Sequence, residues 1–175
     1  MTTRRKWMFG GVAGGVALVL VAVLYVKVQE ARHSVRQTLC VHNLKFISTA
    51  MQVYARDNGG SFPNSLSALY PQYLPQLEAY ICPELLPDFE KKRDISQPTS
   101  SKLEPAEIDS MASYVLVPGL TLSGDKDAVV AYEKTDNHSG KGRSFLYLDG
   151  RGAWEPSEKW RDGPPNVNLP PGFRE

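Results

Sequence analysis

The first third of the chain contains no proline, and this feature limits the possible folds more than any other. No proline occurs between Trp7 and Asn58, and no glycine interrupts residues 16 to 58. A helix over residues 7 to 58 would have about 50 residues and a length of about 75 Å. The Asp-Asn-Gly-Gly corner at residues 57 to 60 supplies a stop, because asparagine and glycine accept the left-handed backbone of a helix end. A helix of that length is unusual in a globular fold.

The start of this predicted helix is apolar. Residues Trp7 to Val26 are 20 consecutive uncharged positions, and a helix of that length spans roughly 30 Å of hydrocarbon. Basic residues flank both ends of the block, and the tail before it is very short, which favours a cytoplasmic N-terminus and an extracytoplasmic C-terminal domain. A cleaved signal peptide is the alternative, but no small-x-small cleavage site follows the block.

The second part of the helix is amphipathic. Apolar residues recur at steps of four, three, four and three, which places them on one face. They are Cys40, Leu44, Ile47, Met51 and Tyr54. We expect Leu44, Ile47, Met51 and Tyr54 to pack against the rest of the domain as its helix-sheet core.

Strand patterns follow in the second half of the chain. Three segments rich in β-branched and aromatic residues lie at 113–117, 128–134 and 144–148, and a short fourth strand is expected at 152–155. Asp149-Gly150 predicts a tight hairpin turn of type I′, with a longer loop or a bulge as the alternative. The polar stretch 83–112 has no persistent periodicity and is expected to be a surface excursion.

Together these patterns predict an α+β chain with five parts. They are a cytoplasmic tail at 1–6, a transmembrane helix at 7–26, an amphipathic helix at 27–58, an α+β domain at 59–156 and an extended Pro/Gly-rich tail at 157–175. In this arrangement the amphipathic helix covers one side of a small antiparallel sheet.

His138, Asp149 and Gly150 form the most conspicuous polar motif. A catalytic function would need His138 as a base oriented by Asp149, together with a nucleophile, but no nucleophile elbow follows a strand. The favoured interpretation is local structure. His138 would bond backbone groups of its own connector, and Asp149 would form an Asx turn over Gly150. We therefore predict that the chain is not an enzyme.

The two cysteines leave two alternatives open. Cys40 and Cys82 could form one disulfide, worth roughly 4 kcal/mol by the chain-entropy model, or remain as two buried thiols. Zinc is disfavoured, because the cysteines and histidines lack closely spaced pairs. Asp125 and Asp127 are weak candidates for calcium, with a polar turn favoured instead. No other cofactor is expected.

Charge excludes one class of partner. The formal net charge is +1, and the basic run outside the flanks of the apolar block, Lys91 to Arg93, adjoins acidic residues. This pattern indicates a solvated loop, so no nucleic-acid partner is expected.

The sequence after the apolar block resembles the long helix of type IV pilin-like proteins, and especially the pseudopilins of type II secretion. The shared features are a tyrosine near the helix end, an Asp-Asn-Gly corner and an aromatic-proline pair. Here they are Tyr54, Asp57 to Gly59 and Phe62-Pro63.

A particular branch of that family resembles the chain further. Its members carry a histidine, nine residues and then Asp-Gly, with a cysteine before Asn-Leu-Lys and a later Cys-Pro. The matching residues are His138 with Asp149-Gly150, Cys40 before Asn43 to Lys45, and Cys82-Pro83. Two features differ: ten residues separate His138 from Asp149, and the prepilin cleavage signature is absent.

The resemblance implies a pilin-like fold and a structural or interaction function. The expected partners are the membrane, other pilin-like subunits and components of a type II secretion or pilus-like envelope apparatus. The alternative is a membrane-anchored extracytoplasmic domain that binds a ligand or calcium, or, less favoured, a hydrolase that uses the loop of His138 and Asp149.

Overall fold

The computed structural model describes residues 3–86, 103–134 and 137–160, without the side chains of residues 3–14, 139, 159 and 160. Most of the predicted C-terminal tail, and residues 87–102 of the predicted excursion, lie outside this part. The chain divides into two compact units, Met1–Val35 and Arg36–Glu175.

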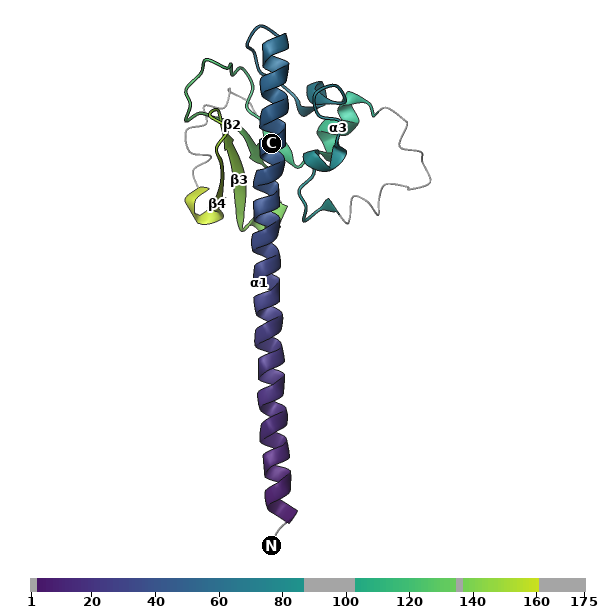
Figure 1. Ribbon diagram of the computed structural model, residues 1–175, viewed down its shortest axis with the longest axis vertical. Coiled ribbons are helices and arrows are strands. Elements are labelled where there is room, and N and C mark those ends of the chain that lie inside the picture. The colour runs from purple at the N-terminus through teal and green to yellow at the C-terminus, as the bar shows by residue number, and fades with distance from the viewer. Residues whose placement is uncertain (1–2, 87–102, 135–136, 161–175) are drawn as a thin grey trace. The chain divides into compact units, whose positions relative to one another are not determined.

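The long helix predicted for the first third of the chain is present. Helix α1 covers Thr3–Asp57 (Figure 1). It ends at the predicted corner, where the backbone N–H of Gly60 donates to the carbonyl of Ala55 at 2.7 Å and Gly59 has a φ of 65°. This is a helix end of the kind that glycine stabilises.

In the N-terminal unit, the helix presents apolar side chains all around its surface. The exposed residues include Val16, Leu18 to Val21 and Val23 to Val26. Among the described residues, no helix is both long enough and apolar enough to cross a membrane. The side chains at 7–14 of the predicted span fall outside the described part.

The predicted antiparallel meander is confirmed in the second unit. Strands β1 (Tyr114–Leu116), β2 (Val129–Glu133), β3 (Gly142–Tyr147) and β4 (Gly152–Pro156) form one four-stranded sheet in sequence order. Every neighbouring pair is antiparallel, and Val115 lies opposite Tyr132 while Phe145 lies opposite Ala153. The α+β class is therefore shown.

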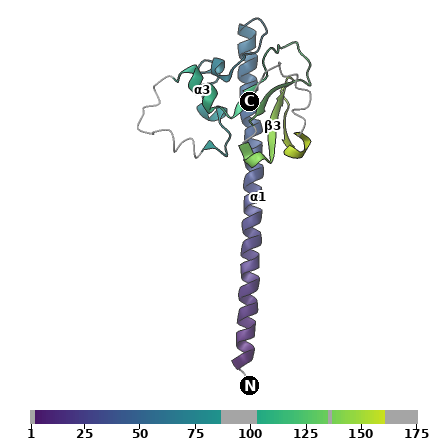
Figure 2. The same cartoon turned by 180° about the vertical axis from the view of Figure 1, so that it is seen from behind.

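A group of short helices lies on the other side of α1 from the sheet (Figures 1 and 2). It comprises the 3₁₀ helices η1 (Leu66–Leu69) and η2 (Leu77–Tyr80) and the helix α3 (Pro105–Met111). Helix α3 lies in the predicted surface excursion, where no helix was expected. Pro105 begins this helix, and a capping box between Glu104 and Glu107 closes its first turn.

The core lies around the C-terminal part of α1. Leu44, Ile47 and Met51 are at most 1% exposed and belong to one cluster with residues of the sheet and the short helices. Tyr54 is half-buried, and its ring packs edge-on against Tyr73 with centroids 5.3 Å apart. This packing carries Cys40, one turn before Leu44, into the interior.

Candidate functional site

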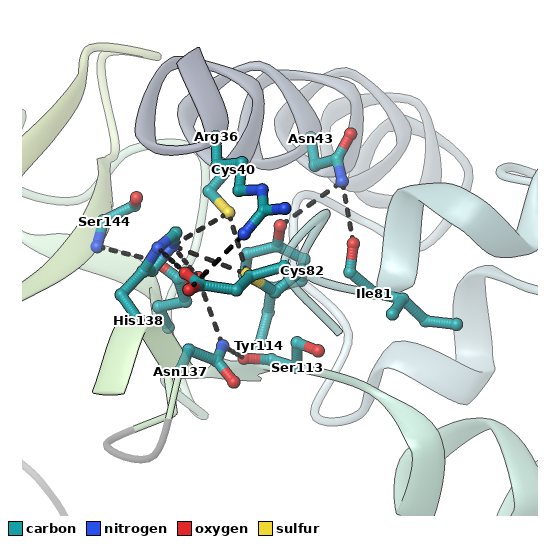
Figure 3. A network of polar contacts seen from close by, with 12 residues as sticks. Arg36, Cys40, Asn43, Ile81, Cys82, Ser113, Tyr114, Asn137, His138 and Ser144 are labelled. Carbon is teal, nitrogen blue, oxygen red and sulfur yellow. Dashed lines mark hydrogen bonds and ion pairs between the residues drawn. The ribbon is translucent and has the colours of Figure 1, made fainter. Parts of the chain in front are cut away.

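Four side chains with metal-binding atoms meet in the interior of the second unit (Figure 3). Cys40 comes from α1, Cys82 follows η2, Glu133 ends β2, and His138 lies in the 3₁₀ helix η3 (Asn137–Gly140). None of the four is more than 1% exposed. Their donor atoms all lie within 4.8 Å of one another. We call these four residues the Cys-Glu-His cluster.

The Nε2 atom of His138 is the centre of the shortest contacts. It lies 3.0 Å from Oε1 of Glu133, 3.2 Å from Sγ of Cys40 and 3.4 Å from Sγ of Cys82. The two sulfur atoms are 3.2 Å apart and are not bonded to each other. The structure therefore holds the two cysteines as buried free thiols, which is the alternative to the disulfide.

Further polar groups surround the cluster. Nδ1 of His138 lies 2.7 Å from Oε2 of Glu84, whose other oxygen lies 3.7 Å from Arg36. The side-chain amide of Asn137 donates to Oε1 of Glu133 at 3.2 Å, and the backbone N–H of Ser144 donates to Oε2 at 3.0 Å. Both oxygens of the buried Glu133 carboxylate thus accept hydrogen bonds, as the burial of a charge requires.

The backbone at His138 is unusual. Its φ is 53°, the only positive φ of a non-glycine residue in the described part of the chain. Asn137 fixes the start of this turn, because its side-chain N–H also donates to the carbonyl of Ser113 at 2.9 Å. The edge of the Trp154 ring system packs against the imidazole, with centroids 4.8 Å apart. A positive φ is uncommon outside glycine, although histidine adopts it more often than most residues, and it directs attention to this position as a candidate site.

The charges in the cluster stabilise one another. Burial would lower the pKa of His138, but its hydrogen bonds to Cys82 and Glu133 outweigh burial and raise that pKa to about 10. Burial would raise the pKa of Glu133, yet the imidazole beside it gives a net lowering. The contact between the thiols raises the pKa of Cys40 and lowers the pKa of Cys82. The raised pKa of His138 and the lowered pKa of Glu133 both favour the charged form of this pair.

The structure bears on two expectations from the sequence. His138 does not act only within its own connector, because it contacts residues from α1, β2 and the segment after η2. The lack of closely spaced cysteine and histidine pairs does not prevent a metal-binding arrangement, because the fold brings residues 40, 82, 133 and 138 together. Spacing along the chain is informative only for sites made by one local segment.

Asp149 and Gly150 lie at the other end of β3 from His138. The six residues of β3 correspond to roughly 20 Å, so His138 and Asp149 do not form a pair. The backbone N–H of Arg151 donates to Oδ1 of Asp149 at 2.9 Å, which is an Asx turn. The N–H of Tyr147 donates to the carbonyl of Arg151, and the φ of Gly150 is 84°. The turn is the longer loop with a bulge, not type I′.

The acidic loop before β2 is also a turn. Oδ1 of Asp125 accepts the backbone N–H of Asp127 at 3.0 Å, and the Asp127 carboxylate pairs with the Arg151 guanidinium. Arg151 also pairs with Asp149. One guanidinium therefore bridges two carboxylates across the loop and the hairpin, which uses oxygens that a calcium ion would need.

No protein-family model, curated protein or solved structure matches the chain. The pilin-like resemblance therefore stays an expectation from the sequence.

Proposed function

We propose that the chain is a single-pass, membrane-anchored interaction protein of pilin-like type. Residues 7–26 would form the anchor, with the N-terminus in the cytoplasm and the unit from Arg36 outside it. The surface of α1 would bind a helix of another pilin-like subunit in a type II secretion or pilus-like envelope apparatus. The function is structural and non-enzymatic.

The main support for this proposal is a row of exposed apolar side chains on α1. Leu39, Phe46 and Val53 are 44%, 49% and 42% exposed. They are seven residues apart, so they share one stripe of the helix, as the contact positions of a coiled coil do. We call these three residues the heptad stripe. An exposed apolar row of this kind is a typical helix-binding surface.

A groove beside the stripe adds to this surface. It has a volume of about 450 Å³ and runs between α1 and the segment from Tyr73 to Ala79. Phe46, Ala50 and Val53 line it from the helix, and Tyr73 and Leu74 line it from the other side. An apolar helix fits this site, because its side chains at every third or fourth position would enter a groove parallel to α1.

The N-terminal unit supports the membrane anchor independently. Its described side chains from Val16 to Val26 are exposed and apolar around the whole helix. A helix that is apolar on all sides is stable when lipid or protein surrounds it. In the sequence, this stretch continues back to Trp7 without a charge.

Chemical cross-linking of the full-length protein in its native membranes tests the helix-binding surface. We expect a discrete cross-linked species that Phe46→Glu removes, because a carboxylate would have to be desolvated in an apolar contact. Lys45→Glu is the matched control, since Lys45 is exposed next to Phe46 outside the stripe. It should leave the cross-linked species unchanged.

Folding must be checked for both variants. Phe46→Glu should unfold at the same temperature as the unchanged protein, whereas Ile47→Glu, which places a charge at a fully buried position, should not fold stably. A cross-linked species that persists in a folded Phe46→Glu Val53→Glu double variant would refute the proposed surface.

A further inference from the structure

We propose that the Cys-Glu-His cluster binds one Zn²⁺ ion, with Sγ of Cys40, Sγ of Cys82, Nε2 of His138 and one carboxylate oxygen of Glu133 as its four ligands. The site would be structural, and it goes beyond the proposed interaction function, because it concerns the interior of the second unit and not its surface.

The donor set fits zinc better than calcium or magnesium. Thiolate sulfur, imidazole nitrogen and carboxylate oxygen are the ligands of protein zinc sites, and a closed site with four protein ligands is typical of structural zinc. Calcium and magnesium require oxygen ligands, and the cluster contains only one carboxylate among its four groups. The ion would be buried, because all four residues are at most 1% exposed.

The spacing of the donors is close to that of a zinc tetrahedron. The four recorded separations between donor atoms lie between 3.0 Å and 3.4 Å. With zinc–sulfur bonds of 2.3 Å, tetrahedral geometry places two sulfur atoms about 3.8 Å apart. Each sulfur would therefore have to move outward by only a few tenths of an ångström to reach the tetrahedral separation. A rotation about the χ1 angles of the two cysteines would produce such a movement.

Hydrogen bonds alone explain this arrangement less well than a bound metal ion does. A single N–H at Nε2 points in one direction, yet one carboxylate oxygen and two thiol sulfurs lie within 3.4 Å of that nitrogen, so this N–H can be directed at only one of the three. One metal ion at the centre of the cluster would bind Nε2 and these three atoms at the same time. On binding, Zn²⁺ replaces the protons of both thiols and the Nε2 proton, and these protons leave to the solvent.

The surrounding residues match those that orient metal ligands. The second nitrogen of a ligating histidine usually faces a carboxylate, a backbone carbonyl or water, and here Nδ1 of His138 makes a 2.7 Å ion-pair contact with Oε2 of Glu84. Ligating carboxylates are hydrogen-bonded in turn, and Glu133 accepts from Asn137 and Ser144. Figure 3 shows Cys40, Cys82 and His138 directed toward one another beneath α1.

The test uses the full-length protein, purified in detergent under reducing conditions and stripped of metal. We expect one equivalent of Zn²⁺ to bind in a competition titration with a chromophoric chelator. We expect Co²⁺ to give the absorption of a tetrahedral site with a sulfur-to-metal charge-transfer band. Cys40→Ser, Cys82→Ser and His138→Gln should each weaken zinc binding at least tenfold.

His42→Gln is the matched control. His42 is an exposed histidine on α1, two residues from Cys40, and its ring packs against Phe46. Its zinc affinity should equal that of the unchanged protein. Circular dichroism shows which ligand variants stay folded. If none of the variants folds, the cobalt spectrum of the unchanged protein tests by itself whether sulfur atoms bind the metal.

Three results would overturn the zinc site. They are the absence of stoichiometric zinc binding by the reduced protein, a cobalt spectrum without a sulfur band, and full zinc affinity in a folded Cys40→Ser Cys82→Ser double variant. Because no partner is present in this experiment, its outcome is independent of whether the heptad stripe binds another subunit.

Discussion

At the scale of single residues, His138 combines a left-handed backbone with side-chain contacts to two carboxylates and to the two buried cysteines. Its left-handed backbone turns the ring inward, and each ring nitrogen lies within 3.0 Å of a carboxylate oxygen, from Glu84 and Glu133 respectively. Glu133 is fully buried, so its charge depends on this histidine. Removing one partner of a buried ion pair leaves an uncompensated charge.

His138→Asn isolates this dependence, because asparagine tolerates a positive φ but carries no cation. We expect the free energy of unfolding to fall by about 3 to 5 kcal/mol, measured by urea denaturation without metal. His42→Asn, at an exposed position on α1, should change it by less than about 0.5 kcal/mol. Equal stability of the two variants would contradict the pairing of His138 with Glu133.

Asp149 gives a separate prediction at the same scale. The backbone N–H and the guanidinium of Arg151 lower the pKa of its carboxyl group below the usual 3.8. Its contribution to stability is therefore present above that usual pKa and is lost as the pH falls through the lowered value. In an NMR titration, Arg151→Ala should raise the pKa of Asp149, whereas Arg56→Ala, on the distant helix end, should not. An unchanged pKa in Arg151→Ala would show that the guanidinium has no effect.

These two residues also show what a sequence reveals about a site. The Asx turn of Asp149 depends on neighbours within two positions, so the dipeptide Asp-Gly was enough to predict it. The contacts of His138 come from residues 56 and 98 positions away, and no local pattern encodes them. A weak signal existed: Glu133 is an acidic residue at the end of an otherwise apolar strand, five positions before a histidine.

At the scale of elements, the sheet lies close to α1 at Gly152 of β4. A Cβ atom added to Gly152 would lie 2.5 Å from a methyl carbon of Val41, which is too short for any real contact. The absence of a side chain at Gly152 therefore permits the backbone of β4 to rest against the helix. This contact lies one residue along α1 from Cys40, so it also positions the cluster.

Gly152→Ala should lower the free energy of unfolding by about 1 to 3 kcal/mol through overpacking. Val41→Ala should restore part of the loss, because it removes the methyl group that clashes. Thermal unfolding of both single variants and the double variant measures this coupling. Strictly additive effects would show that the two residues do not meet.

The elements differ in how well their sequences predict them. The C-terminal part of the long helix follows from its apolar periodicity, and the strands follow from their β-branched and aromatic composition. Helix α3 was missed because it has seven residues and buries only Ile108, so no period can be recognised. Its start was nevertheless encoded, by Pro105 and by the acidic pair Glu104 and Glu107 that forms the capping box.

At the scale of the whole molecule, the apolar N-terminal block is the feature on which the proposed location depends. We expect the protein to stay with membranes after alkaline carbonate washing and to dissolve only in detergent. Leu20→Arg Leu24→Arg should shift it to the soluble fraction, because each arginine adds about 2.5 to 3.5 kcal/mol at the centre of a membrane helix. The matched control, Ala31→Arg Val35→Arg, changes two exposed positions of α1 with the same spacing, C-terminal to the block and outside the heptad stripe, and should leave the protein with the membranes. A double variant of the block that remains with the membrane would argue against the anchor.

The Cys-Glu-His cluster has one more consequence for the whole chain. Its members lie in α1, in the segment after η2, at the end of β2 and in η3, and they join residues up to 98 positions apart. A peptide bond broken between Cys82 and Glu133 would therefore leave two fragments, each holding two of the four groups. The fragments would remain associated through shared ligands and a shared core. Two separately made halves of the chain could in this way reassemble into one folded domain.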